Sequence, residues 1–197
     1  MPISASQWIA QHGGHLRSIS ARKLRQACQR ADGECTWCGG KLTGRQSAWC
    51  GRLCVDAFLQ LQPRNMRDVV HARDHGRCRQ CKRDCDRMFY LARRLLCLAA
   101  KNVSWAATVT ALRAHWASVG FHISRDFSNE HYWEANHIVP VCQGGGLRGP
   151  DNYETLCVPC HAAATRQLYR ELRAQRAARG KQQNMKGKSR YVKRRGK

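Results

Sequence analysis

The order of apolar and polar positions in the second half of the chain predicts a strand, a loop, a second strand and a helix. Residues 132–141 are aromatic and β-branched, which favours a strand, and residues 143–150 contain three consecutive glycines, which favour a loop. Residues 153–157 predict a short returning strand. A helix is expected to begin at Pro159, because proline suits the first helical turn.

Helical spacing predominates in the rest of the chain. Weak periodicity of leucine and isoleucine predicts a basic helical arm over residues 1–30, which either packs through those apolar residues or contacts a polyanion. Two short helices are expected at residues 55–61 and 67–74.

Residues 86–121 predict an inserted helical region before the first strand. Ser104 is expected to cap one of its helices, and Gly120 suits the C-terminal end of that helix. The expected apolar face carries Trp105, Val109, Leu112 and Trp116. This helical spacing favours core packing of the tryptophans over stacking on bases.

The charge of the chain indicates what it binds. Lys and Arg number 35 against 13 for Asp and Glu, which gives a formal net charge of +22 and a pI near 10.3. Nucleic acid is the expected partner, because binding to phosphates releases counterions. An anionic membrane surface is the alternative. No segment approaches the roughly 18 consecutive apolar residues of a membrane span, so no membrane partner is expected.

The N-terminal residues 1–14 lack a basic start followed by an apolar stretch, so no signal peptide is expected. We therefore expect a cytoplasmic protein, and interpret its origin as bacterial or phage. In a reducing compartment the 12 cysteines are better explained as metal ligands than as disulfides.

Eight of these cysteines form closely spaced pairs. The pair Cys35 and Cys38 is followed by two glycines, and Cys50 and Cys54 form a second pair nearby, which predicts one zinc held by four thiolates. The alternative is a set of free or buried thiols, which rarely fall in two such pairs.

A second zinc is expected from two pairs that lie far apart in the sequence. Cys78 and Cys81 have no neighbouring pair, and Cys157 and Cys160 are their obvious partners. A shared zinc would make residues 78–165 one folded unit. The remaining cysteines, which are expected to be buried thiols, are Cys28, Cys85, Cys97 and Cys142. The alternative for Cys85 is that it competes as a ligand in the site of Cys78.

Three polar residues between these cysteine pairs suggest chemistry. His137 falls on the first expected strand, Asn152 where the loop rejoins the second strand, and His161 one residue after Cys160. Hydrolysis of a phosphodiester needs a base for water and a cation for the developing charge, and a histidine can serve as either base or metal ligand. Each residue alone has an ordinary structural explanation. Only their joint spacing favours a catalytic site.

Residues 78–166 resemble an HNH endonuclease domain, a ββα-metal fold between two zinc-binding CxxC pairs. The resemblance depends on the following motifs: Cys78–Cys81, Asn136-His137-Ile138-Val139-Pro140, Gly144-Gly145-Gly146, Asp151-Asn152 and Leu156-Cys157 to Cys160-His161 with Thr165. Residues 50–84 and the long insert are also similar to the HNH domain at the end of annealing-helicase proteins with Ran-binding-type zinc fingers.

The resemblance implies a role for each site residue. His137 would be the general base, His161 a metal ligand, and Asn152 would hold the loop and the base in position. The family normally has a metal-binding Asp before the base; here Asn136 would coordinate the metal through its amide oxygen without a negative charge. We therefore expect Glu134, on the same strand face, to supply part of the missing negative charge at the metal. Ala164 is a second departure, because the family often has Lys there. The implied cofactors are two structural Zn²⁺ and one catalytic Mg²⁺ or Mn²⁺.

The expected fold class is α+β: a small zinc-stabilised ββα-metal core with a helical insert, preceded by a four-cysteine zinc module and followed by a basic helical or disordered tail. The expected divisions are residues 1–30 (arm), 31–63 (zinc module), 64–170 (nuclease domain with insert 86–121) and 171–197 (tail). A helix is expected to end near Gly180. Contacts with DNA are expected from Arg166, Arg170, Arg173, Lys193, Arg194 and Arg195.

The sequence thus predicts a metal-dependent DNA endonuclease. Two alternatives remain: a catalytically weak, zinc-dependent DNA-binding protein, and a nuclease subunit of a larger complex.

Overall fold

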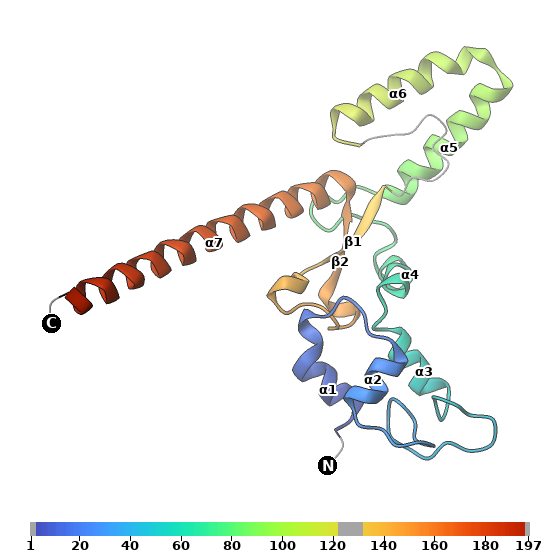
Figure 1. Ribbon diagram of the computed structural model, residues 1–197. Helices are drawn as coiled ribbons and strands as arrows, with labels where there is room; N and C mark the ends of the chain where they lie inside the picture. The colour runs from blue at the N-terminus through green and yellow to red at the C-terminus, as the bar shows by residue number, and fades with distance from the viewer. Residues whose placement is uncertain (1–2, 122–131, 196–197) are drawn as a thin grey trace.

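The computed structural model describes residues 3–121 and 132–195, and the side chains of these residues apart from 63–65 and 180–195. The α+β class is confirmed, with one two-stranded sheet among helices in this part of the chain (Figure 1). The elements are α1 (Ala5–His12), η1 (Gly13–His15), α2 (Ala21–Ala27), α3 (Arg52–Leu59), α4 (Pro63–Asp74), α5 (Cys85–Lys101), η2 (Val103–Trp105), α6 (Ala106–Ser118), β1 (Trp133–His137), η3 (Val141–Gln143), η4 (Pro150–Asn152), β2 (Tyr153–Cys157) and α7 (Val158–Arg195).

The two strands form an antiparallel hairpin that continues directly into α7. Trp133 pairs with Cys157 at one end of the ladder and His137 pairs with Tyr153 at the other. The second strand has the predicted bounds, but the first ends at His137 rather than near residue 141. Pro140 cannot donate a hydrogen bond to the ladder, and the chain then turns into η3.

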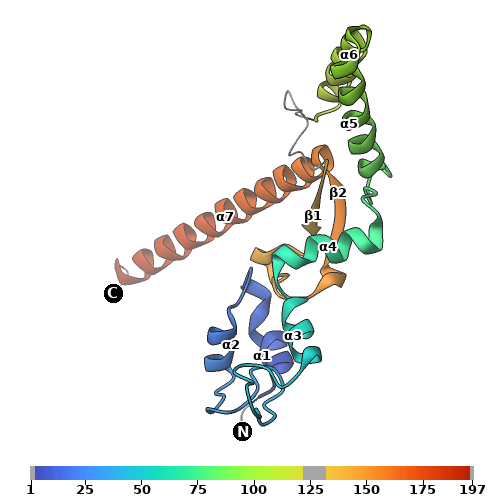
Figure 2. The ribbon, with the colours of Figure 1, turned by 90° about the vertical axis from the view of Figure 1, so that its right-hand side faces the viewer.

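The hairpin lies between two helices. Figure 2 shows α4 crossing the hairpin, and α7 contacts both strands as well. At the start of β1, the Arg67 guanidinium lies 4.1 Å from the Trp133 ring centroid, and His71 stacks on the same ring at 5.6 Å. At the other end of α4, Arg73 donates a hydrogen bond of 2.8 Å to the carbonyl oxygen of Tyr153 on β2. These contacts fix the hairpin on α4.

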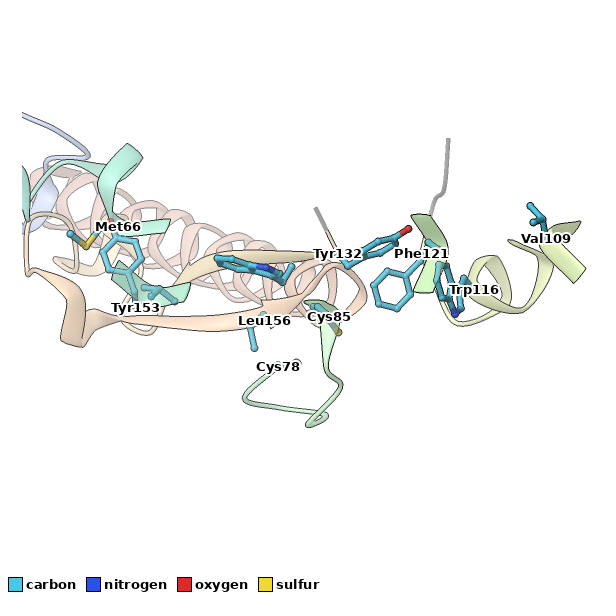
Figure 3. Close-up of a cluster of buried hydrophobic side chains, with 13 residues drawn as sticks. Met66, Cys78, Cys85, Val109, Trp116, Phe121, Tyr132, Tyr153 and Leu156 are labelled. Atoms are coloured by element: carbon cyan, nitrogen blue, oxygen red, sulfur yellow. The ribbon is translucent and has the colours of Figure 1, made fainter. Parts of the chain in front are cut away.

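The inserted helices extend the same core away from the hairpin. Tyr132 lies among aromatic rings of the insert, 5.4 Å from Trp116 and 5.8 Å from Phe121 between ring centroids (Figure 3). Val109 and Trp116 are buried, as expected, whereas Trp105 is 39% exposed. The Ser104 cap was wrong: α6 has no side-chain cap, and the Asn102 side chain accepts a hydrogen bond from the Ser104 backbone N–H instead.

A second cluster of buried side chains joins the N-terminal helices to two other parts of the chain. Ser4 and Gln7 form a capping box that starts α1, and Ser20 caps α2. Leu24 of α2 is completely buried. The cluster combines N-terminal residues with Trp37, Phe58 and Leu61 of the zinc module and with Leu147 of the loop between the strands.

The C-terminal helix is longer than the sequence predicts. α7 contains 38 residues and passes Gly180 to reach Arg195, a length of about 57 Å at 1.5 Å per residue. Each of the two glycines within α7, Gly180 and Gly187, costs only about 1 kcal/mol in a helix, and the neighbouring Lys, Arg, Gln and Met residues are good helix formers. Of the helices described, none combines the length and apolar character that crossing a bilayer would require.

Candidate functional site

The first four-cysteine cluster brings its two sequence pairs together. The sulfur atoms of Cys35, Cys38, Cys50 and Cys54 all lie within 4.8 Å of one another. The Sγ–Sγ distance is 3.4 Å for Cys38 and Cys50, and 3.6 Å for Cys50 and Cys54. Tetrahedral Zn–S bonds of about 2.3 Å separate sulfur atoms by about 3.8 Å, so the cluster fits zinc.

The second cluster joins residues almost 80 positions apart. Cys78, Cys81, Cys157 and Cys160 place their sulfur atoms within 4.8 Å of one another, with 3.6 Å between those of Cys81 and Cys157. The Arg79 backbone N–H donates a hydrogen bond of 2.8 Å to the carbonyl oxygen of Thr155, which attaches this CxxC turn to β2. Both predicted cysteine groupings are therefore assembled.

One thiol in each cluster is acidic. Burial raises the pKa of Cys35 and of Cys78, but hydrogen bonds from neighbouring backbone and thiol groups outweigh burial and bring the two values to about 6 and about 7. Thiolates are the form that binds zinc. Cys85 lies outside the cluster, and burial raises its pKa to about 12. The expectation that Cys97 and Cys142 are buried was wrong, since both are exposed.

A cavity of about 860 Å³ lies beside the hairpin and the first turns of α7. β1 contributes Asn136 and His137 to its wall, β2 contributes Glu154 and α7 contributes His161. Arg17, from the segment between η1 and α2, lines the same cavity. The predicted residues Asn136, His137 and His161 therefore line one cavity. The order strand, loop, strand and helix brings them together there.

His137 is half-buried in this cavity with a free ring nitrogen. Its ring centroid lies 4.2 Å from that of Tyr153. Its Nε2 atom is buried and has no hydrogen-bond partner among the described residues. Burial lowers the pKa of His137, and the positive charge of Arg17 lowers it further. Both effects favour the neutral imidazole, which can accept a proton.

Asn152 does not line the cavity but fixes the backbone around it. Its Oδ1 accepts a hydrogen bond of 2.8 Å from the Val139 backbone N–H, and its Nδ2 donates to the carbonyl oxygens of Val139 at 3.0 Å and Gly145 at 2.6 Å. The side chain is 8% exposed. Asn152 thus joins the end of β1 to the glycine loop and holds the turn that follows His137.

The carboxylate beside Asn136 is Glu154. Asn136 and Glu154 are directly paired across the sheet, and the Asn136 Nδ2 donates a hydrogen bond of 3.1 Å to Glu154 Oε1. Glu134, which the sequence places at the metal, lies away from the cavity wall, and its Oε2 is 3.0 Å from Arg67 Nη1. Alternation along β1 indicated the correct strand face but not the arginine on α4 that pairs with Glu134.

Two residues of the cavity wall escaped sequence reasoning. Glu154 could have been found from the register of the hairpin, because opposite residues in an antiparallel pair share a face. Arg17 carried no local signal, since it reaches the cavity only through the packing of the N-terminal segment. Among the described His, Cys, Asp and Glu side chains, only the two cysteine clusters gather three or more ligand atoms within 4.8 Å.

The predicted DNA-contacting residues of the tail begin on α7 within the stretch that lines the cavity, which runs from His161 to Leu172. Arg166, Arg170 and Arg173 are exposed and follow helical spacing along one side of α7. Lys193, Arg194 and Arg195 belong to the same helix, and their side chains lie outside the described residues.

Comparisons with known proteins show what the chain is similar to. Residues 121–167 match the HNH endonuclease family. The chain is 29% identical over 168 residues to the DNA annealing helicase and endonuclease ZRANB3 of Mus musculus, and 26% identical over 165 residues to that of Homo sapiens. Each match covers 80% of this chain and 15% of the relative. No solved structure matches this chain.

These findings confirm the resemblance to the HNH family and to the annealing-helicase type of HNH domain. The relatives are mammalian proteins, so they give no support to a bacterial or phage origin.

Proposed function

We propose that this chain, whose residues 121–167 match the HNH endonuclease family, is a metal-dependent endonuclease that hydrolyses DNA phosphodiester bonds. The observation that supports this most is the cavity in which Asn136, His137, Glu154 and His161 meet, from two strands and a helix. The named activity of the relatives, DNA annealing and endonuclease, agrees with the nuclease class.

The donor atoms around the cavity fit a hard divalent cation. Asn136 offers an amide oxygen, Glu154 a carboxylate and His161 a ring nitrogen, a set that suits Mg²⁺ or Mn²⁺, whereas the sulfur atoms are gathered in separate clusters. We assign the charge expected of Glu134 to Glu154, because Glu134 is paired with Arg67. A bound cation would neutralise charge on the phosphate and on the leaving oxygen.

His137 is the general base of the proposed reaction. Its imidazole, kept neutral by burial and by the charge of Arg17, takes a proton from water while the water oxygen forms a bond to phosphorus; the bond from phosphorus to the 3′ oxygen breaks, and that oxygen takes a proton from solvent. The products are a 5′-phosphate and a 3′-hydroxyl. Asn152 holds the backbone after His137 through the Val139 hydrogen bonds, so it positions the base without contacting the DNA.

DNA is the proposed substrate because the chain is strongly basic. The net charge of +22 favours phosphate binding. Arg166, Arg170 and Arg173 alternate along α7 with residues that line the cavity, and they are proposed to contact the DNA backbone, with Lys193, Arg194 and Arg195 further along the helix. The chain spans about 15% of the length of its curated relatives. That it acts as the nuclease subunit of a larger complex is a separate proposal.

The test is nicking of supercoiled plasmid by the purified chain with Mg²⁺ or Mn²⁺, and with EDTA. His137→Ala is the critical variant. His115→Ala is its matched control, because His115 is exposed on α6 and lies outside the cavity. We expect nicking that requires metal and His137 but not His115. Equal nicking by the His137→Ala protein would rule out the proposed base.

One observation favours a second candidate, a DNA-binding protein that cuts weakly. Asn136 carries no charge and its amide donates to Glu154, so the cation site has one carboxylate fewer than an Asp at this position would give. Under this alternative the protein binds plasmid, forked or single-stranded DNA tightly and in a salt-dependent way, without nicking it. The substitution Asn136→Asp would then create cleavage that the wild-type chain lacks.

A further inference from the structure

The N-terminal segment is joined to the glycine loop by direct backbone contact. The Gly146 backbone N–H donates a hydrogen bond of 2.5 Å to the carbonyl oxygen of Gly14, and the Leu147 N–H donates one of 3.0 Å to that of Gly13. Leu147 is 4% exposed and belongs to the buried cluster of the N-terminal helices. The loop between the strands therefore has the N-terminal segment as its packing partner.

Glycine is required on both sides of this contact. A Cβ atom at Gly146 would lie 2.2 Å from the Leu16 carbonyl oxygen, and one at Gly14 would lie 2.5 Å from the Gly144 carbonyl oxygen. Such distances are too short for any larger residue unless the backbones separate. Part of the glycine run in the loop thus serves the N-terminal contact as well as the turn itself.

This contact places Arg17 at the cavity. Arg17 follows the docked segment by three residues, and its positive charge acts on His137. Within the described part of the chain, Arg17 is exposed, makes no hydrogen bond or ion pair, and is the only lysine or arginine lining this cavity. Glu154 and Glu171 line the same wall. In a chain of net charge +22, the one guanidinium of the described cavity wall has no hydrogen-bond or ion-pair partner among the described residues.

We propose that Arg17 binds a phosphate of the DNA strand that enters the cavity, so that the N-terminal segment completes the nuclease site. This inference rests on the proposed function for its substrate. A guanidinium matches the geometry of a phosphate with two parallel hydrogen bonds and keeps its charge at all relevant pH values. Without Arg17, the carboxylates of Glu154 and Glu171 would be the only described side chains in the wall with a fixed charge.

The experiment compares the wild-type chain with Arg17→Ala, Arg17→Lys and Arg45→Ala. Arg45 is a matched control, because it is an exposed arginine in the loop between the two pairs of the first cysteine cluster and lies outside the cavity. Gly146→Ala tests the docking contact while Arg17 is kept. Zinc content and thermal unfolding show that each variant is folded. Single-turnover cleavage of a labelled duplex and its dissociation constant at several salt concentrations are measured.

We expect Arg17→Ala to slow cleavage at least tenfold and to make the plot of log affinity against log salt less steep by about 0.9, the value for one phosphate contact. Arg17→Lys should recover part of the rate, Gly146→Ala should resemble Arg17→Ala, and Arg45→Ala should remain within twofold of wild type. Cleavage and affinity of Arg17→Ala equal to those of Arg45→Ala would overturn the proposal. If the wild-type chain binds DNA without cutting it, the proposed function fails, and the affinities still decide the role of Arg17.

Discussion

Asp74, at the C-terminal end of α4, accepts two hydrogen bonds from Thr155 at the centre of β2. The Thr155 backbone N–H lies 3.2 Å from Asp74 Oδ2, and the Thr155 hydroxyl lies 2.9 Å from the same oxygen. Thr155 is completely buried, and Arg73 holds the Asp74 carboxylate with a 2.6 Å contact from its Nε. Both pairs of the second cysteine cluster are thereby linked: α4, which precedes Cys78 and Cys81, is hydrogen-bonded to β2, which leads into Cys157 and Cys160.

Replacing Asp74 should therefore weaken the whole domain. We expect Asp74→Ala to lower the free energy of unfolding by about 2 kcal/mol, because it leaves the buried Thr155 groups without an acceptor. Asp68→Ala, an exposed acid on the same helix, is the control. Denaturant unfolding of the zinc-loaded protein gives both values, and equal stability of the two variants would contradict this role.

The stability that the Asp74 carboxylate contributes should depend on pH with a definite sign. Hydrogen bonding to Arg73, then to Thr155, holds the pKa of Asp74 below its ordinary value despite burial. The stabilisation by the carboxylate is therefore fully present above the ordinary carboxyl pKa and decreases as the pH falls through the lowered value. The stability difference between wild type and Asp74→Asn should shrink over this range, while zinc release affects both proteins alike.

The glycine loop should tolerate no side chain at Gly145. A Cβ atom there would lie 1.7 Å from the Val139 carbonyl oxygen and 2.8 Å from the Asn152 Nδ2. We expect Gly145→Ala and Asn152→Ala each to destabilise the domain by about 3 kcal/mol, through the loss of the same buried hydrogen bonds. Their double variant should cost much less than the sum of the two.

Gly51→Ala is the matched control for this series, because nothing lies within 4 Å of a Cβ atom at that position. Thermal unfolding monitored by circular dichroism measures all four variants. Fully additive losses in the double variant would show that Gly145 and Asn152 act separately.

Removal of one zinc ligand should unfold the hairpin region. Cys160→Ser leaves three sulfur ligands in the second cluster, and we expect it to lose one zinc per chain with a large drop in thermal stability. Cys97→Ser should keep both zinc ions and wild-type stability, since Cys97 is exposed and outside both clusters. Atomic emission measures the zinc content of both variants, and an unchanged zinc content in Cys160→Ser would contradict the assignment of Cys160 as a zinc ligand.

Glu154 and Glu134 should differ in their effect on the catalytic cation. Glu154→Gln removes the carboxylate that lies beside Asn136, whereas Glu134→Gln breaks only the pair with Arg67. We expect Glu154→Gln to raise the Mn²⁺ concentration needed for half-maximal cleavage at least tenfold, and Glu134→Gln to change it less than threefold. Titration of the cleavage rate with Mn²⁺ measures both, and the reverse order would restore the role expected for Glu134.

The arginines of α7 should act on affinity more than on chemistry. Replacing Arg166, Arg170 and Arg173 together by Gln should weaken binding to DNA of every sequence. The plot of log affinity against log salt should become less steep by up to about 2.7, the value for three phosphate contacts. The cleavage rate of fully bound DNA should stay near that of the wild-type chain. A binding assay at several salt concentrations tests this, and an unchanged slope would exclude these residues from the interface.

The sequence predicted most strongly what depends on local spacing. The CxxC pairs, the second strand and the start of α7 follow from cysteine, β-branched and proline positions within a few residues of one another. The first strand was predicted too long, because Ile138, Val139 and Val141 continue the apolar strand pattern, whereas strand pairing ends at His137 and Pro140 has no N–H to extend the ladder.

Long-range packing explains what the sequence did not reveal. The pairing of Glu134 with Arg67, and the arrival of Arg17 beside His137, depend on elements separated by many residues. Ser104 does not cap α6 because it lies within η2, a short 3-10 turn that Asn102 caps and that the sequence pattern did not distinguish from the start of the helix.

The second cysteine cluster also determines how readily the insert can change in length. Cys81 and Cys157 are neighbours across 76 positions, and the intervening chain includes the whole α5–α6 pair. Once the ends of such a loop are joined, doubling its length adds only about 0.6 kcal/mol of closure entropy. Changing the length of this connection therefore costs little closure entropy, and what holds α5 and α6 in place is instead the burial of Val109 and Trp116 in the core that they share with Tyr132.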